Sequence, residues 1–152
     1  NELVFPYLEK NLGDFPTVEL HRKGVFSFSG SSVLFARPEG TASGSIQEVQ
    51  YNPSDPSGLD RSKQVIELVG IETVLEKSQE RYVLKIDAEG SEYDILATAA
   101  SLGALDRCDA TWIEYHRGPQ NLPDLLISAG LSPVISPKDS EMGLIVGKRV
   151  RS

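Results

Sequence analysis

Short apolar runs alternate with amphipathic segments from residue 64 onward, and this alternation limits the fold more than any other feature of the sequence. The pattern predicts strands at 64–68, 82–87 and 110–116, helices at 71–77, 91–102 and 122–129, and a final pair of strands at 132–136 and 142–146. Strands and helices at this spacing form βαβ units with a mainly parallel sheet, so we expect an α/β fold. Right-handed crossovers would place the carboxyl ends of strands 82–87 and 110–116 at one edge of that sheet.

The first sixty residues follow a different pattern. Apolar residues recur at helical spacing from Leu3 to Leu12, and Gly13 follows as a natural stop. Alternation predicts a short strand at 17–21 and a hairpin whose strands, 25–28 and 32–35, flank a Ser-Gly-Ser turn. The segment 38–60 is rich in Gly, Ser, Pro and Asp, with one candidate strand at 46–51, and is either a lid over a site or a surface loop.

Length and charge exclude several classes of protein. The 152 residues suit a single domain spanning 1–152, and a net charge of −7 without a basic stripe argues against a nucleic-acid partner. No apolar run approaches the roughly 18 residues of a membrane span. Cys108 is the only cysteine, so no intrachain disulfide can form and we expect a cytoplasmic protein. The chain begins with Asn1, which is compatible with a longer protein that carries a targeting segment upstream.

Three carboxylates follow the apolar strand 82–87 within a few residues: Asp87, Glu89 and Glu92. Ligands of open α/β sheets bind outside the carboxyl ends of the parallel strands, so these groups would face a ligand crevice. Gly90, between them, permits a positive φ or a close backbone approach. The structural alternatives are an ion pair of Lys85 with Asp87 or a neighbouring acid, and helix-dipole stabilisation of Glu89 and Glu92 in the first turn of the next helix.

The second predicted strand, 110–116, places Glu114 and His116 on one face near its carboxyl end. A histidine oriented by a carboxylate is the usual general base for a hydroxyl, whereas a histidine that only caps the strand is the structural alternative. The residues Asp87, Glu89, Glu114 and His116 could also ligate Mg²⁺ or Mn²⁺. Because no metal motif with diagnostic spacing is present, we expect no metal site.

The segment Leu84-Lys85-Ile86-Asp87-Ala88-Glu89-Gly90-Ser91-Glu92 closely resembles the L-K-I-D-x-E-G-x-E signature of FkbM-type S-adenosylmethionine-dependent methyltransferases. The run Ile113-Glu114-Tyr115-His116 is similar to the E-x-H strand that follows in that family. The resemblance extends to the opening helix, the hairpin, the variable loop and the helix before Leu131, so it spans nearly the whole chain. It implies a Rossmann-like methyltransferase that transfers a methyl group from S-adenosylmethionine to a small-molecule hydroxyl.

The resemblance also implies roles for individual residues. Asp87, Glu89, Glu114 and His116 would be catalytic, Asp87, Ala88 and Glu89 would contact the cofactor, and Lys85, Glu92 and His116 would contact the substrate. One departure is large: the sheet apparently lacks the family's first two strands, with the G-x-N-x-G turn that follows the first and the acidic residue that ends the second. The chain is therefore expected to be either the carboxyl-terminal part of a longer enzyme or a reduced homologue.

Two other functions are compatible with the same residues. One is a non-catalytic Rossmann-like binding module that has lost the cofactor site, and the other is a carboxylate-dependent metal hydrolase. The methyl acceptor itself has no decodable pattern in the sequence.

Overall fold

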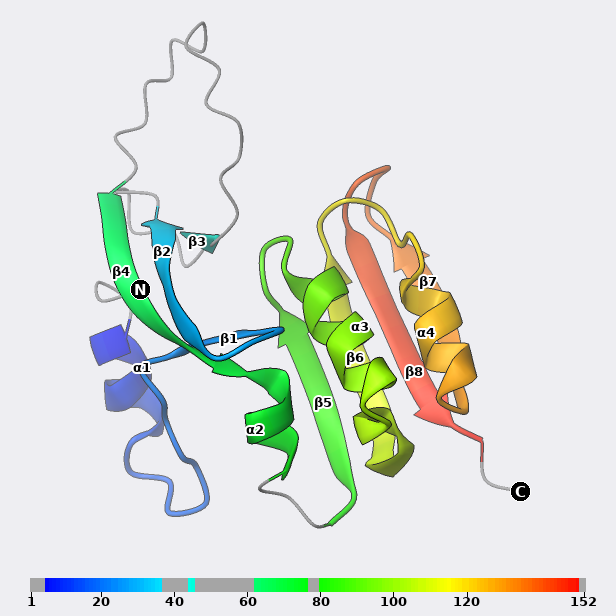
Figure 1. The fold of residues 1–152 in the computed structure, drawn as a ribbon, viewed down its shortest axis with the longest axis horizontal. Helices are drawn as coiled ribbons and strands as arrows, with labels where there is room; N and C mark the ends of the chain where they lie inside the picture. The colour runs from blue at the N-terminus through cyan, green and yellow to red at the C-terminus, as the bar shows by residue number, and fades with distance from the viewer. Residues whose placement is uncertain (1–4, 37–43, 46–61, 77–79, 151–152) are drawn as a thin grey trace, which may run out of the picture. The chain divides into compact units, whose positions relative to one another are not determined.

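The computed structural model describes residues 5–36, 44–45, 62–76 and 80–150, which are coloured in Figure 1. The chain divides into two compact units, one made of Asn1–Gly24 and Gly30–Leu68 and the other of Val25–Ser29 and Val69–Ser152. Each unit is described by itself, and the single domain spanning 1–152 stays a prediction. The predicted strand at 46–51 and nearly all of the loop at 38–60 lie outside the described residues.

The first unit begins with helix α1, Phe5–Leu12, as the apolar spacing predicts. The amide of Gly13 donates to the carbonyl of Glu9 at 2.7 Å, which closes the helix at the expected residue. The predicted strand at 17–21 is wrong, because this segment forms a turn and extended chain without strand pairing. Val18 N donates to Phe15 O at 3.0 Å, and both side chains are exposed, so no buried face holds the segment in a sheet.

The first sheet has the order β1-β4-β2-β3, with β1 at Gly24–Phe26, β2 at Gly30–Ala36, β3 at Gly44–Ser45 and β4 at Ser62–Gly70. The predicted hairpin is wrong, because β4 lies between the two strands that should form it. All seven residues of β2 pair antiparallel with β4, from Gly30 opposite Leu68 to Ala36 opposite Ser62. A three-residue β1 offers β2 far fewer backbone hydrogen bonds than the nine-residue β4 does, so the long-range pairing prevails over the local turn.

The second sheet has the order β5-β6-β8-β7, with β5 at Tyr82–Asp87, β6 at Cys108–Tyr115, β7 at Leu131–Pro137 and β8 at Gly143–Arg149. Only β5 and β6 are parallel, whereas β8 is antiparallel to both β6 and β7. The predicted mainly parallel sheet is therefore wrong for the described strands. The connection from β7 to β8 is too short for a crossover: Lys138 N and Asp139 N both donate to Met142 O, so the two strands form a hairpin.

Strand β4 belongs to the first sheet, so β4, helix α2 at Ile71–Glu76 and β5 do not form the predicted βαβ unit. Strand β5 is also less buried than predicted: Ile86 is its only buried residue and Val83 is 60% exposed. Alternate residues of β5 are exposed, as a strand with one uncovered face requires.

Helices α3, Glu92–Ser101, and α4, Leu122–Ser128, cover the other face of the second sheet (Figure 1). The short 3₁₀ helix η1, Ala104–Arg107, precedes β6. Four apolar residues of α3 are buried: Tyr93, Ile95, Leu96 and Ala99. They join the fully buried Leu105, Ile113, Leu122, Leu126 and Ile145 in one core. Among the described residues, no helix is long and apolar enough to cross a membrane.

Candidate active site

The parallel pair of β5 and β6 brings the two polar strand ends to one edge, as predicted. Asp87 at the end of β5 lies opposite Glu114 of β6. Asp87 is exposed and Glu114 is half-buried, so both carboxylates lie where a ligand could reach them. The ammonium of Lys85 lies 3.5 Å from Asp87 Oδ2, which confirms the ion pair that was the structural alternative for Lys85.

The turn that follows β5 has an uncommon backbone. Gly90 has φ 100°, as its position in the motif allows, and Glu89 has φ 47° although it carries a side chain. Two successive left-handed residues cannot continue a right-handed helix, so α3 begins only at Glu92. The prediction that Glu89 lies in the first helical turn is therefore wrong. A left-handed non-glycine residue costs about 1–2 kcal/mol, and such strain collects at functional sites.

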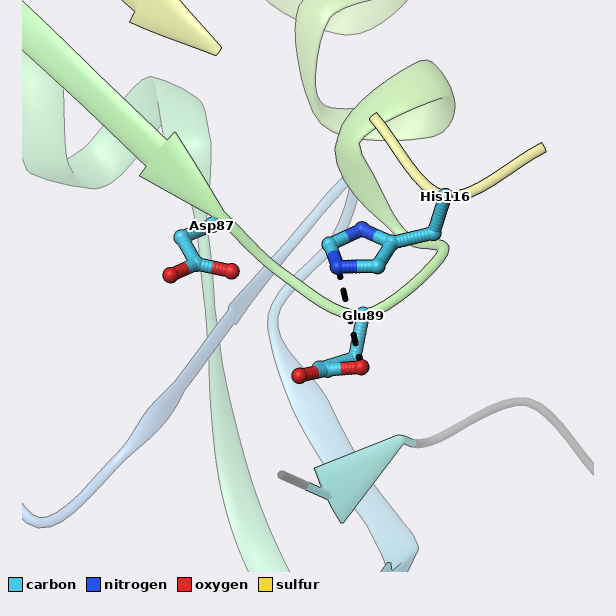
Figure 2. A group of neighbouring side chains, drawn as sticks. All are labelled: Asp87, Glu89 and His116. Atoms are coloured by element: carbon cyan, nitrogen blue, oxygen red, sulfur yellow. Dashed lines mark ion pairs between the residues drawn. The ribbon is translucent and has the colours of Figure 1, made fainter. Parts of the chain in front are cut away.

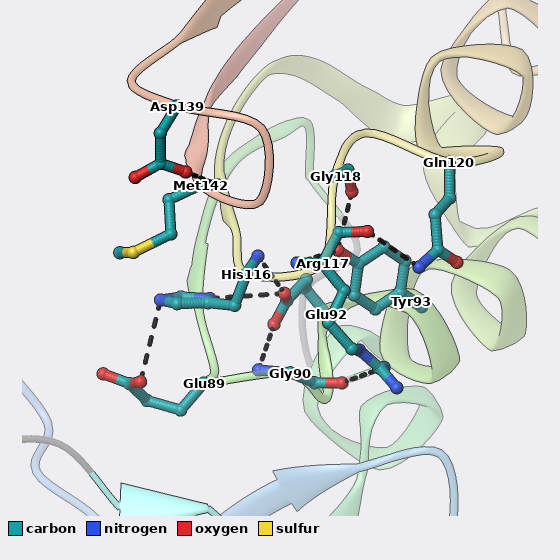
Figure 3. Close-up of polar contacts among 10 residues, drawn as sticks. All are labelled: Glu89, Gly90, Glu92, Tyr93, His116, Arg117, Gly118, Gln120, Asp139 and Met142. Carbon is teal, nitrogen blue, oxygen red and sulfur yellow. Dashed lines mark hydrogen bonds and ion pairs between the residues drawn. The ribbon is translucent and has the colours of Figure 1, made fainter.

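Glu92 is the most deeply buried charged residue of the site, with 0% exposure. Its Oε2 accepts a hydrogen bond from Gly90 N at 2.8 Å, and its Oε1 accepts one from His116 N at 2.9 Å (Figure 3). These bonds join the turn after β5 to the end of β6 and compensate the burial of the carboxylate. The contact between Glu92 and a substrate stays a prediction. The buried position of Glu92 suits a residue that holds the two segments together.

His116 follows the last residue of β6, and its side chain is 13% exposed. The ring Nδ1 lies 3.3 Å from Glu92 Oε1, and Nε2 lies 3.7 Å from Glu89 Oε2. Because a carboxylate only accepts, Nδ1 carries the proton of the bond to Glu92. Nε2, on the opposite side of the ring, points toward Glu89.

Tyr93 and Arg117 form a second support that the sequence did not reveal. Arg117 N donates to Tyr93 Oη at 2.8 Å, and Tyr93 Oη donates to Gly118 O at 2.7 Å (Figure 3). The guanidinium of Arg117 lies over the Tyr93 ring, 4.6 Å from its centre, and also donates to Gly90 O. Burial is the main cause that raises the pKa of Tyr93, so its hydroxyl stays a donor. The pair holds the loop after β6 against the start of α3.

Asp87, Glu89 and His116 come together at this edge, each from a different segment (Figure 2). One ligand-type atom from each lies within 4.8 Å of the other two. Of the four residues predicted as catalytic, Glu114 is the one outside this group. Ala88 is half-buried within the turn between the two acids.

The edge offers backbone groups and carboxylates to a ligand, but the described residues lack the elements that would hold a whole S-adenosylmethionine molecule. The turn with two left-handed residues brings backbone and carboxylates to the mouth of β5, where a charged ligand could contact them. The sequence contains no G-x-N-x-G turn, and the described sheet contains only one parallel pair of strands. The described residues therefore do not fit the cofactor's amino-acid and ribose groups.

Comparison with known proteins identifies the family. No curated protein and no solved structure matches the chain. The family model described as the methyltransferase FkbM domain matches residues 11–129, which include β5, α3, β6, α4 and all residues of the site. The chain therefore belongs to the FkbM family of methyltransferases.

Proposed function

We propose that this protein methylates a hydroxyl group of a sugar or another small metabolite. The observation that carries the proposal is the pairing of His116 with two carboxylates at the carboxyl edge of β5 and β6, in a chain of a methyltransferase family. S-Adenosylmethionine supplies the electrophilic methyl group when it is bound. The residues of this edge would hold and orient the acceptor hydroxyl toward that methyl group and would help its proton to leave. Positioning of the acceptor contributes most to such a transfer, and help with the proton contributes the rest.

The residues of the edge divide into two groups. Asp87, Ala88 and Glu89 line the side where the methyl donor would approach, and Glu114 and His116 line the acceptor side. Lys85 is exposed, and its ion pair with Asp87 at 3.5 Å lies at the surface, so its ammonium can turn from Asp87 to a polar substrate. The arrangement supports binding of the acceptor hydroxyl between Glu89 and His116, where Nε2 faces a carboxylate and both side chains retain access to solvent.

Glu92 acts as a positioning residue in this proposal. Its Oε1 binds both the backbone amide and the ring Nδ1 of His116, so the imidazole keeps one tautomer and one direction. Its Oε2 holds Gly90 N, which fixes the strained turn that carries Glu89. The buried carboxylate therefore aligns both partners of the pair that would contact the acceptor.

The cofactor's amino-acid and ribose groups would bind to elements that the described residues do not include. This part of the proposal rests on the missing G-x-N-x-G turn and on the single parallel pair of the second sheet. It treats the two strands β5 and β6 as the acceptor-side part of a larger cleft. The family match favours an enzyme over a binding module that has lost the cofactor.

The test uses the full product of the gene. Titration with S-adenosylhomocysteine in a calorimeter should show saturable binding, and transfer of a labelled methyl group should occur to members of a panel of sugars and hydroxylated metabolites. His116→Ala should lower kcat by about 10²–10⁴-fold while the affinity for S-adenosylhomocysteine stays unchanged. Asp124→Asn, which removes an exposed acid of α4, is the control and should leave transfer unchanged.

Two results would contradict the proposal. If the full gene product does not bind S-adenosylhomocysteine, the proposal of a cofactor-dependent methyltransferase is refuted. Full activity of His116→Ala would remove His116 from the reaction.

A further inference from the structure

Donor atoms from three segments converge at the carboxyl edge of the second sheet. Asp87 ends β5, Glu89 lies in the left-handed turn, and His116 follows β6. Two carboxylate oxygens and one imidazole nitrogen lie within 4.8 Å of one another (Figure 2). A mixed set of this kind suits divalent first-row metal ions, because carboxylates and imidazole are both common ligands for them.

A positive charge between the Glu89 and His116 side chains, either a proton on Nε2 or a bound cation, would be stabilised by both. His116 Nδ1 is occupied by Glu92, so in the neutral ring the lone pair of Nε2 faces the carboxylate of Glu89. Two electron-rich atoms that face each other repel unless a positive charge lies between them. The separation of 3.7 Å is too long for a direct hydrogen bond.

The spacing matches a bridging ion. Two ligand atoms that each lie about 2.1 Å from one ion in tetrahedral geometry are separated by about 3.4 Å. The observed 3.7 Å between His116 Nε2 and Glu89 Oε2 is close to that value. All three atoms lie within 4.8 Å of one another, and a separation near this upper bound would have to shrink by roughly half an ångström, since opposite ligands of one ion lie about 4.2 Å apart. Rotation of the Asp87 carboxylate can supply this change, because that side chain is 40% exposed.

We propose that Asp87, Glu89 and His116 bind one divalent transition-metal ion and leave its remaining positions open to oxygen ligands. The site has the outer support that histidine ligands of metals require, because the buried Glu92 carboxylate holds the far nitrogen of the ring. The ammonium of Lys85 lies 3.5 Å from Asp87 Oδ2 and would compete with the metal ion for this carboxylate. Its side chain is 72% exposed, so it can turn into solvent when the ion arrives.

The ion would define the class of acceptor, and this step rests on the proposed function. A hydroxyl oxygen bound to a divalent ion loses its proton far more readily than a free hydroxyl does. The acceptor would therefore be a compound that reaches the ion through an oxygen. His116 and Glu89 would then promote loss of the hydroxyl proton through the ion, and the proton would pass to solvent water.

The experiment measures binding of Mn²⁺ to the chain alone, without cofactor or acceptor. After treatment with a chelator and desalting, titration is followed by loss of the paramagnetic signal of free Mn²⁺. One ion should bind per chain. Glu89→Gln and Asp87→Asn each remove one ligand at an exposed position, and each should weaken the affinity at least about tenfold. Asp124→Asn removes the same charge elsewhere on the surface and should bind as the unchanged chain does.

Glu92→Gln gives an independent test, since it leaves all three ligands in place. It should weaken Mn²⁺ binding about tenfold or more, because loss of the hydrogen bond from Gly90 N releases the turn that carries Glu89, and a neutral amide supports the His116 ring less than a carboxylate does. Circular dichroism of each variant checks that the fold is intact. No saturable binding of Mn²⁺, or equal affinity of Glu89→Gln and Asp124→Asn, overturns the metal site. The methyltransferase proposal is judged separately by S-adenosylhomocysteine binding, so the two can fail independently.

Discussion

Substitution of the buried Glu92 by glutamine tests how the two strand ends are joined. The carboxylate accepts three hydrogen bonds, one at Oε2 from Gly90 and two at Oε1 from His116. A glutamine amide has a single acceptor oxygen, and placing it at the Oε1 position preserves both bonds to His116. The amide NH₂ then faces Gly90 N–H, so one charge-assisted hydrogen bond is lost and two donors confront each other.

The expected cost follows from this count. Loss of a hydrogen bond to a charged group costs about 1.5–3 kcal/mol, and release of a buried charge offsets part of it. We expect the free energy of unfolding to fall by about 1–3 kcal/mol, which lowers the urea midpoint by on the order of 1 M. Trp112, the only tryptophan, lies on β6 and reports unfolding of the second unit by its fluorescence.

Asp124→Asn is the matched control, because it also removes an acid from the first turn of a helix. Asp124 is exposed, so its substitution changes only the interaction with the helix dipole, about 0.3–1 kcal/mol. A urea midpoint of Glu92→Gln equal to that of this control would refute the reasoning, because the buried hydrogen bonds would then contribute nothing measurable.

Three further predictions concern the second unit. Gly143→Ala should destabilise it by about 1–3 kcal/mol in urea titration, since an added Cβ would lie 2.8 Å from the backbone Cα of Pro137; unchanged stability would contradict the tight strand pairing. Burial raises the pKa of Tyr82 from 10.0 to about 12, and neutral Tyr82 is the form that the fold favours, so its stabilising contribution should be complete below pH 10 and decline from there to about pH 12. Absorbance titration at alkaline pH should show late-titrating tyrosine, to which Tyr93 also contributes, and Tyr82→Phe should reduce this late component. Cys108 is fully buried and burial raises its thiol pKa, so a thiol reagent should label it only after unfolding, and rapid labelling of the native chain would contradict its placement.

The local sequence pattern was sufficient to predict the helices and strands of the second unit that pack against one core. The strand at 82–87 and the helix at 91–102 were predicted close to their observed bounds, because their periodicity records which face meets the core. The pairing of strands was predicted less well. The hairpin at residues 25–35 and the mainly parallel sheet both failed, because β2 pairs with β4 and β6 pairs with β8 over long sequence separations that no local signal records.

The residues of the candidate site were likewise predictable only in part. The motif identified Asp87 and Glu89, and the parallel register of β5 and β6 brought His116 to them as expected. The burial of Glu92 and the link between Tyr93 and Arg117 could not be predicted, because a charged residue and an arginine after a strand are usually exposed. Their roles depend on side chains that meet only after α3 has packed on β6.

The place of β8 between β6 and β7 has a consequence for synthesis of the protein. Strand β7 leaves the ribosome first, but its only neighbour among the described strands is β8. Strand β6 likewise lacks its second neighbour until Gly143–Arg149 has emerged. The second sheet therefore cannot grow strand by strand as the chain lengthens. Its assembly is delayed until the last described strand inserts between β6 and β7. Until then both strands have unpaired edges, to which chaperones could bind.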